Sequence, residues 1–190
     1  MLRVNVRRLA LLALLALAPA AQAQEAQPGK ARIGLGISYN PVDSLLRPRE
    51  GFTPVSVNVP IDLGAVRVEP SLGILSLDTD NSGKSSAVDL GVGVFFLMKS
   101  SKDFHVYAGP RLVLGFASAE SAGGLKDSGV DVRLAAALGA EWFAAPSFSF
   151  GAEAQLGFQS IAKLQDGNAL LRDGSTGFDT AGLAFLRFYL

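Results

Sequence analysis

Two stretches of the chain alternate apolar and polar residues at every second position for more than ten residues. They are Val130–Phe143 and Phe148–Gln159, and the four residues Ala144–Ser147 join them. Such alternation predicts β-strands, and a short turn between two such runs predicts a hairpin. Strands of soluble domains usually have about five or six residues, whereas a tilted strand that spans a bilayer needs about nine to eleven. The length of this pair therefore favours a membrane-spanning hairpin.

Eight runs of this kind follow one another along the chain. In order, they are Lys30–Asn40, Thr53–Leu63, Ala65–Leu75, Ala87–Met98, Phe104–Phe116, Val130–Phe143, Phe148–Gln159 and Asp179–Leu190. The connections alternate between short ones (Asp62–Ala65, Lys99–Asp103, Ala144–Ser147) and long ones (Pro41–Phe52, Ser76–Ser86, Ala117–Gly129, Ser160–Phe178). Short periplasmic turns and longer outer loops are typical of bacterial outer-membrane barrels. The pattern predicts an all-β fold over residues 30–190, an eight-stranded antiparallel up-and-down transmembrane β-barrel.

The two registers of these runs differ in charge. The apolar register has no charged residue. The polar register contains Asp62 and His105 and ten residues predicted to form a lumenal charge network: Arg32, Arg67, Glu69, Asp89, Arg111, Asp131, Arg133, Glu141, Glu153 and Arg187. An Arg or Lys facing lipid near the midplane costs about 2–4 kcal/mol, so this register must face the lumen. Eight-stranded barrels have lumens filled by side chains, and we expect the charges there to be paired and hydrogen-bonded.

Aromatic and proline residues refine the barrel hypothesis. Aromatic residues collect near the ends of the runs and predict two interfacial girdles: Phe96, Phe104, Trp142, Phe148 and Phe188 on the short-turn side, and Tyr39, Phe116 and Phe158 on the long-loop side. Pro70 and Pro110 lie inside runs and cannot donate to a strand ladder, so we expect a β-bulge or a locally broken ladder at each of them.

The chain begins with the features of an export signal. Met1–Arg8 is basic, Leu9–Ala20 is apolar, and Ala21-Gln22-Ala23 has the small-x-small cleavage pattern. An apolar stretch of twelve residues is shorter than the roughly 20 that a spanning helix needs. We expect residues 1–23 to be a signal peptide cleaved after Ala23, and residues 24–29 to be a short mature leader.

Composition limits the chemistry. Acidic and basic residues balance at 17 each, which gives no reason to expect a nucleic-acid partner, and without cysteine the chain can form neither a disulfide nor a thiolate site. Asp78–Gly83, followed by Asp89, imitates the spacing of a calcium loop, but its strand-like flanks favour a polar hairpin tip. His105 fits a structural lumenal residue on the periplasmic side better than a catalytic one. We therefore expect no cofactor, no metal site and no enzymatic activity.

The chain resembles the small outer-membrane β-barrel family typified by the OmpA transmembrane domain and OmpX. The resemblance covers roughly residues 30–190 and rests on the signal sequence, the eight runs, the alternation of connections and the C-terminal strand. In that strand Leu186, Phe188 and Leu190 follow the alternate apolar pattern of the family, although Leu190 stands where Phe is usual and Arg187 where an aromatic residue is favoured. The resemblance implies outer-membrane localisation, contact with outer-membrane lipid, recognition by the barrel-assembly machinery and a monomeric barrel.

Four functional hypotheses follow. A structural or surface-interaction role, with the barrel anchoring outer loops, agrees best with a filled lumen. The alternatives are a narrow channel for small solutes, in which Arg111 and Arg133 would affect conductance, and a lipid-modifying enzyme that depends on His105. A soluble ligand-binding barrel of the lipocalin kind would reverse the pattern, with the apolar register facing a cavity.

Membrane fractionation separates the soluble alternative from the others. We expect the protein to require detergent for extraction and to migrate differently in gels with and without heating, because a lipid-facing barrel stays folded in cold detergent. Release into the soluble fraction without detergent would contradict the transmembrane prediction.

Overall fold

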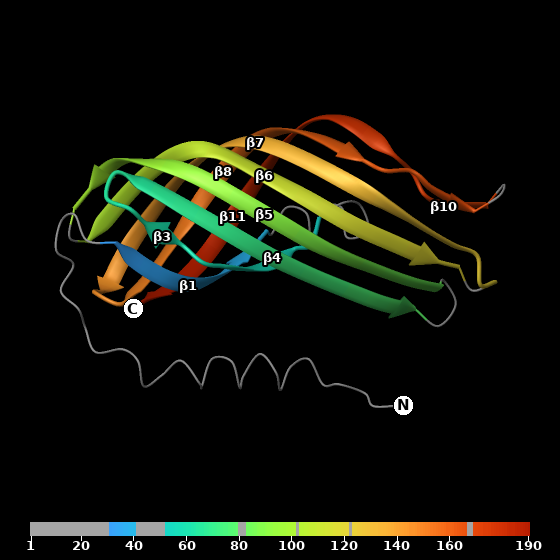
Figure 1. Cartoon of the computed structure of the whole chain (residues 1–190), viewed down its shortest axis with the longest axis horizontal. Coiled ribbons are helices and arrows are strands. Elements are labelled where there is room, and N and C mark those ends of the chain that lie inside the picture. The colour runs from blue at the N-terminus through green and yellow to red at the C-terminus, as the bar shows by residue number, and fades with distance from the viewer. Residues whose placement is uncertain (1–30, 41–51, 80–82, 102, 122, 167–168) are drawn as a thin grey trace, which may run out of the picture.

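The computed structural model describes residues 31–40, 52–79, 83–101, 103–121, 123–166 and 169–190, and the predicted signal peptide and leader lie outside them. Nine strands form one antiparallel sheet that closes because β11 pairs with β1, and two more form a separate hairpin (Figure 1). The strands are β1 (Arg32–Tyr39), β2 (Val55–Asn58), β3 (Ile61–Asp62), β4 (Val66–Thr79), β5 (Gly83–Ser100), β6 (Phe104–Glu120), β7 (Lys126–Ala145), β8 (Phe148–Ile161), β9 (Leu164–Asp166), β10 (Ala169–Arg172) and β11 (Ser175–Tyr189). In the described ranges, no helix is long and apolar enough to cross a membrane.

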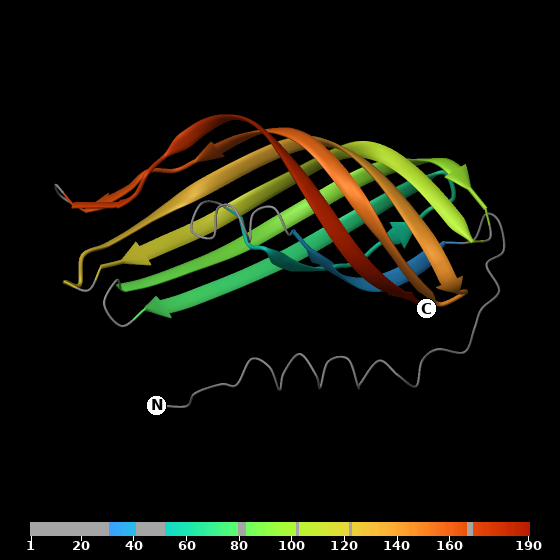
Figure 2. The same ribbon diagram turned by 180° about the vertical axis from the view of Figure 1, so that it is seen from behind.

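The second predicted strand is divided in two. β2 and β3 together occupy one position between β1 and β4, and the same register against β4 continues from Asn58↔Ser71 to Ile61↔Val68. The interruption falls at Val59–Pro60, and proline has no N–H to donate to a ladder. Counting β2 and β3 as one position, the sheet is the predicted eight-stranded antiparallel barrel (Figure 2).

Pro70 lies opposite this interruption. It pairs with Val92 of β5 without a register shift. On its other side the carbonyl oxygen of Pro70 accepts a hydrogen bond from the amide of Val59 at 2.9 Å. Of the two expectations for Pro70, the bulge is wrong and the locally broken ladder is confirmed, because the missing donor faces the interruption between β2 and β3.

Pro110 interrupts a ladder without changing its register. The β5–β6 ladder runs through Gly93↔Arg111 and resumes at Phe96↔Ala108 with the same offset, so two intervening positions are unpaired. A bulge would have shifted the offset by one. Local loss of pairing, the other expectation for this site, is therefore what Pro110 produces.

The short turns lie where the alternation predicted them, and the register shifts of the barrel ladders occur beside two of them. One shift lies between Leu97 and Lys99 and the other between Phe143 and Ala145. In the turn between β3 and β4, Gly64 has a φ of 80°, which favours glycine because it has no Cβ.

Three of the four predicted long connections are mostly regular structure, and the first, Pro41–Phe52, lies outside the described residues except for Phe52. The β4–β5 hairpin continues to the pair Thr79↔Gly83, and the β6–β7 hairpin continues to Glu120↔Lys126. Ser76–Ser86 and Ala117–Gly129 were expected to be loops because their apolar alternation stops. Beyond the apolar belt the outer face of a strand meets no lipid, so alternation ends while backbone pairing goes on. Figure 1 shows these hairpins projecting far beyond β1.

The fourth long connection, Ser160–Phe178, also contains strands. β8 extends to Ile161, β11 begins at Ser175, and β9 and β10 form a hairpin between them. Phe178 therefore belongs to a strand, and its ring packs edge-on against Phe158 at 5.6 Å between centroids. It adds a residue to the predicted outer girdle.

The two faces of the barrel have the predicted polarity. Leu134 and Leu138 on β7 are 56% and 54% exposed on the outer wall, whereas Arg67, Arg111 and Arg133 are buried. At the short-turn end the rings of Trp142 and Phe150 and those of Phe148 and Phe188 form close outer-face pairs, with centroids 4.8 and 4.9 Å apart. The apolar register is therefore the outer surface of the barrel.

Leu138→Arg should lower the free energy of unfolding by about 2–4 kcal/mol, because this position lies near the middle of the apolar belt. Ser128→Arg, on the same strand and face but above the belt, should change it by less than about 1 kcal/mol. Denaturant titration in phospholipid vesicles measures both. Equal effects of the two substitutions would show that the belt does not face lipid.

Candidate functional site

The polar side chains of the lumen form the candidate site. Nine of the ten residues predicted for the charge network are buried: Arg67, Glu69, Asp89, Arg111, Asp131, Arg133, Glu141, Glu153 and Arg187. Arg32, the tenth, is partly exposed. Their strands alternate inward and outward positions, so every second residue enters the same confined space.

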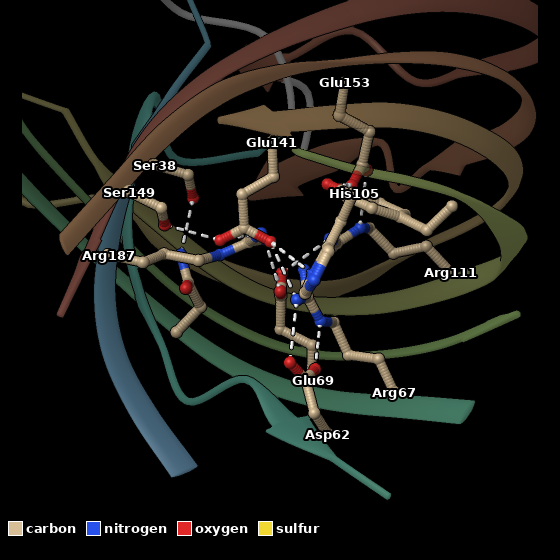
Figure 3. Close-up of polar contacts among 12 residues, drawn as sticks. Ser38, Asp62, Arg67, Glu69, His105, Arg111, Glu141, Ser149, Glu153 and Arg187 are labelled. Carbon is tan, nitrogen blue, oxygen red and sulfur yellow. Dashed lines mark hydrogen bonds and ion pairs between the residues drawn. The ribbon is translucent and has the colours of Figure 1, made fainter. Parts of the chain in front are cut away.

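At the centre of the lumen, Glu69 lies between two guanidinium groups (Figure 3). Its Oε1 is 2.8 Å from Nη2 of Arg111, and its Oε2 accepts a short hydrogen bond from Arg187. Arg111 also donates to both carboxylate oxygens of Glu153, at 3.0 and 3.1 Å. Nη1 of Arg187 lies 3.4 Å from Glu141. Each of these contacts joins two strands that are not neighbours in the sheet, and together they link β4, β6, β7, β8 and β11.

A second group lies nearer the short turns. Nε of Arg67 is 2.5 Å from Asp62, and its Nη2 is 2.7 Å from Glu141. Glu141 also accepts hydrogen bonds from the hydroxyls of Ser149 and Tyr189, at 2.5 and 2.8 Å. Arg67, Asp62 and Glu141 therefore each have a partner of opposite sign, as buried ionic groups require.

Arg32 is placed differently from the other arginines. It donates to the carbonyl oxygen of Pro146 in the β7–β8 turn at 2.7 Å. Its guanidinium lies 4.4 Å from the ring centre of Tyr189 and 4.8 Å from that of Phe143. Arg32 thus covers the short-turn end of the lumen through cation–π contacts rather than through an ion pair with the predicted network.

His105 lies in the same end of the lumen. Its ring packs edge-on against Phe143 at 4.6 Å, and Nδ1 is 4.0 Å from Glu141. Those contacts are the ones a packed lumenal histidine would make. They agree with the expectation of a structural residue.

At the outer end, two further ion pairs join the lumen to residues that the sequence did not single out. Arg172 of β10 binds both carboxylate oxygens of Asp131, at 2.7 and 3.0 Å. Arg133 lies 3.0 Å from Asp179 of β11. The first pair fastens the β9–β10 hairpin to β7.

Asp89 is part of the lumen rather than of a calcium loop. It lies opposite Gly73 on β4 and accepts a hydrogen bond from the backbone amide of Thr53. Among the described residues, no group of three His, Cys, Asp or Glu side chains could hold a metal ion.

Aromatic rings fill the remaining space around the central ion pairs. Phe95 and Tyr107 pack with ring centroids 4.9 Å apart. A Cβ on Gly93 would lie 2.3 Å from the ring of Phe95, and one on Gly139 would lie 2.2 Å from the ring of Tyr107. These two glycines are therefore required because an aromatic ring lies against the backbone at each, that of Phe95 from the same strand and that of Tyr107 from the adjacent strand.

Several polar residues of the site were missed from the sequence. Tyr107, Tyr189 and Asp179 lie in the inward register of predicted strands, so following that register through uncharged residues and strand ends would have found them. Arg172 lies in a segment that was expected to be a loop, and nothing in its local sequence marks it as a partner of Asp131. Only the folded hairpin brings that pair together.

Comparisons with known proteins agree with this architecture. The family described as "outer membrane protein beta-barrel domain" matches residues 9–180. The structure of neisserial surface protein A is similar in fold, with a TM-score of 0.53 and 13% identity over 83% of this chain and 96% of that chain. Ail, the attachment invasion locus protein of Yersinia pestis, solved with the heparin analogue sucrose octasulfate, gives 0.51 and 14% over 86% and 99%. No curated protein matches the sequence significantly.

Glu69→Gln should lower the free energy of unfolding by about 3–5 kcal/mol, because two buried arginines lose a charged partner at once. Glu120→Gln, which also removes one carboxylate but near the outer end of β6, should cost about 0–1 kcal/mol. Equilibrium unfolding in lipid vesicles gives both values. Similar costs for the two variants would mean that the central ion pairs do not stabilise the barrel.

Proposed function

Because the chain belongs to the outer membrane protein β-barrel family, we propose that it is a bacterial outer-membrane protein with a structural and surface-interaction role. In this role the barrel anchors a rigid set of hairpins outside the membrane, and its lumen does not conduct solutes. The proposal depends mainly on one observation, the continuation of regular strands beyond the apolar belt.

The outer hairpins present a polar outer face. Ser86 and Ser118, on the adjacent strands β5 and β6, hydrogen-bond through their hydroxyls at 3.0 Å. Further out, Lys84, Glu120 and Lys126 lie directly opposite one another on β5, β6 and β7. A strand face of this composition suits water rather than lipid, which supports its exposure outside the membrane.

The β9–β10 hairpin is held against β7 by hydrogen bonds between side chains and backbone. Asp166 accepts from the amide of Lys126 at 3.0 Å, and Asp127 accepts from the amide of Gln165 at 2.7 Å. Arg172 adds its ion pair at the mouth of the barrel. Because these contacts order the segment in advance, a partner that binds there loses less entropy than with a flexible loop.

The filled lumen supports a non-conducting barrel. Arg67 and Glu69 of β4 and Arg187 of β11 have at most 1% of their surface exposed, and Arg187 reaches Glu69 across the lumen. A continuous path would require these ion pairs to break, which is costly for buried partners. This arrangement favours the surface role over the channel alternative.

The structure of Ail was solved with a heparin analogue, a highly sulfated polyanion. The row Lys84–Glu120–Lys126 places an acid between two lysines. Such alternation does not create the field of a single sign that concentrates polyanions. We therefore propose that this face of the hairpins recognises a partner other than a sulfated polyanion.

Export and assembly complete the proposal. Residues 1–23 would direct export and be removed after Ala23. Leu186 and Phe188 of the final strand, β11, and Leu190 directly after it are exposed on the outer face, and we propose that this pattern is read by the barrel-assembly machinery. A monomeric barrel in contact with outer-membrane lipid agrees with a sheet whose strands are all paired around the barrel.

Cysteine labelling tests the orientation, since the chain has no native cysteine. A membrane-impermeant maleimide should label Leu125→Cys, in the β6–β7 turn, on intact cells. It should label Ala145→Cys, at the β7–β8 turn, only after lysis. The reverse pattern would contradict the proposed orientation.

Adhesion tests the surface role itself. Leu125 and Leu170 are exposed apolar residues of the outer hairpins, 40% and 51% accessible. If the hairpins bind a partner, Leu125→Asp with Leu170→Asp should reduce attachment of expressing cells to immobilised matrix proteins several-fold, while Ala145→Ser should not. Unchanged attachment, with normal heat-modifiable migration, would oppose the surface role.

A further inference from the structure

The outermost part of β4 has a neighbouring strand on only one side. Its ladder with β2 ends at Ser56↔Gly73, whereas its ladder with β5 continues without a register shift to Thr79↔Gly83. In both views β4 forms the border of the sheet that projects beyond β1 (Figures 1 and 2). Within the described residues, the segment 75–79 of β4 is therefore an unpaired sheet edge.

A hydrogen bond lower on β4 fixes the direction of the main-chain groups along this edge. The carbonyl oxygen of Pro70 accepts from the amide of Val59, on the side of β4 that faces away from β5. In an antiparallel ladder the main-chain groups of successive residues point to opposite sides, and the β4–β5 ladder has no bulge. The N–H and C=O groups of Ser76 and Asp78 therefore also point away from β5. Among the described residues these groups have no hydrogen-bond partner.

The unpaired edge lies beyond the apolar belt. Across β5, Ile74 is level with Phe116 of the predicted outer girdle. Ser76 lies one row further out, in line with Ser86 and Ser118 on the next two strands. Because this row is polar, the edge beside it is in contact with water, where a partner from outside the cell can reach it.

A second unpaired stretch lies on β11, beyond its last pair with β1 at Tyr39↔Ala184. Gly182 in that stretch is level with Leu138 of β7, through the intervening strand β8. Leu138 belongs to the apolar belt, so part of the β11 edge lies at the height of lipid. The edge of β4 is the one that lies wholly outside the belt.

The β4 edge lacks features that usually protect exposed strand edges. Its five residues include no proline and no lysine, and no bulge turns it away from a neighbour. On its inner face Leu77 is 40% exposed and Leu75 is half-buried, and the residues opposite them on β5, Ser85 and Ala87, are small. A strand added here gains main-chain hydrogen bonds and apolar contacts together.

We propose that this edge binds an extended segment of a partner protein, which adds to the sheet as a strand beside β4. The inference rests on the proposed surface role and names the class of partner for it. Main-chain donors and acceptors at strand spacing are matched by another polypeptide in the extended conformation, whereas a sugar or a lipid head group does not repeat them. The bound segment alternates apolar and polar residues, with its apolar side chains beside Leu75 and Leu77.

Hydrogen exchange of the full-length folded protein in detergent micelles, resolved by NMR, tests this docking. The probe is the peptide acetyl-Lys-Thr-Leu-Thr-Leu-Thr-Lys-amide. Its control is the same peptide N-methylated at the leucine and threonine residues, which cannot donate from either edge. The probe should slow exchange of the Ser76 and Asp78 amides by about tenfold or more, because they become hydrogen-bonded. The amides of Leu75 and Leu77, which point toward β5, should change little.

Three variants refine the test. Ser76→Pro removes a donor from the edge but no bond to β5, so the barrel should fold and the affinity for the probe should fall by about tenfold or more. Ser76→Ala keeps the main-chain N–H and should bind the probe as the wild type does. Leu77→Asn keeps every main-chain group but loses the apolar contact, and should weaken binding several-fold even if the proline variant does not fold. Heat-modifiable migration shows which variants are folded.

The proposal is overturned if the N-methylated peptide binds as well as the probe, or if the probe leaves the exchange of Ser76 and Asp78 unchanged. Protection of β11 amides in their place overturns it as well. Attachment of expressing cells to immobilised matrix proteins separates this proposal from the surface role. If Leu125→Asp with Leu170→Asp reduces attachment while Ser76→Pro and Leu77→Asn do not, the surface role stands and the β4 edge is not its docking site.

Discussion

The ion pairs across the lumen are the interactions on which this barrel depends. Ladder hydrogen bonds join each strand only to its two neighbours. The pair of Arg187 with Glu69 joins β11 to β4, and the pair of Arg67 with Glu141 joins β4 to β7. These contacts hold opposite walls at a fixed separation. The same burial that makes unpaired charges costly also makes these pairs intolerant of losing one partner.

Aromatic packing and ion pairing divide the lumen into layers. Arg111 and Arg187 lie over the rings of Phe95 and Phe185, at 5.0 and 3.8 Å from the ring centres. The apolar face of each guanidinium is thus covered while its edges bind carboxylates, an arrangement that suits arginine better than lysine. This layering closes the lumen at its centre, and a polar cavity lined by Thr53, Ser71, Asp89 and Arg133 lies on the outer side of it.

Sequence alternation was sufficient to predict the barrel, its two faces and its short turns, because lipid and a charged lumen impose opposite demands on adjacent positions. Alternation could not predict strands in regions where the outer face does not meet lipid. The outer parts of β4–β7 meet water on their outer face, so their strands left no alternating signal. Pro60 was read as an ordinary position of a long run. The pair of Arg172 with Asp131 depends on the fold of a distant hairpin, which no local pattern encodes.

Strand β1 has 8 residues and β7 has 20, so the apolar outer surface of the barrel is shorter along β1 than along β7. On β1 the outward apolar residues extend from Ile33 to Tyr39, whereas on β7 they extend from Val130 to Trp142. At about 3.3 Å per residue and a tilt of about 40°, these spans correspond to roughly 15 Å and 30 Å. Acyl chains beside β1 must shorten or splay where those beside β7 can stay extended, and such mismatch has a free-energy cost for every ångström. We therefore expect the bilayer to be thinner beside β1 than beside β7.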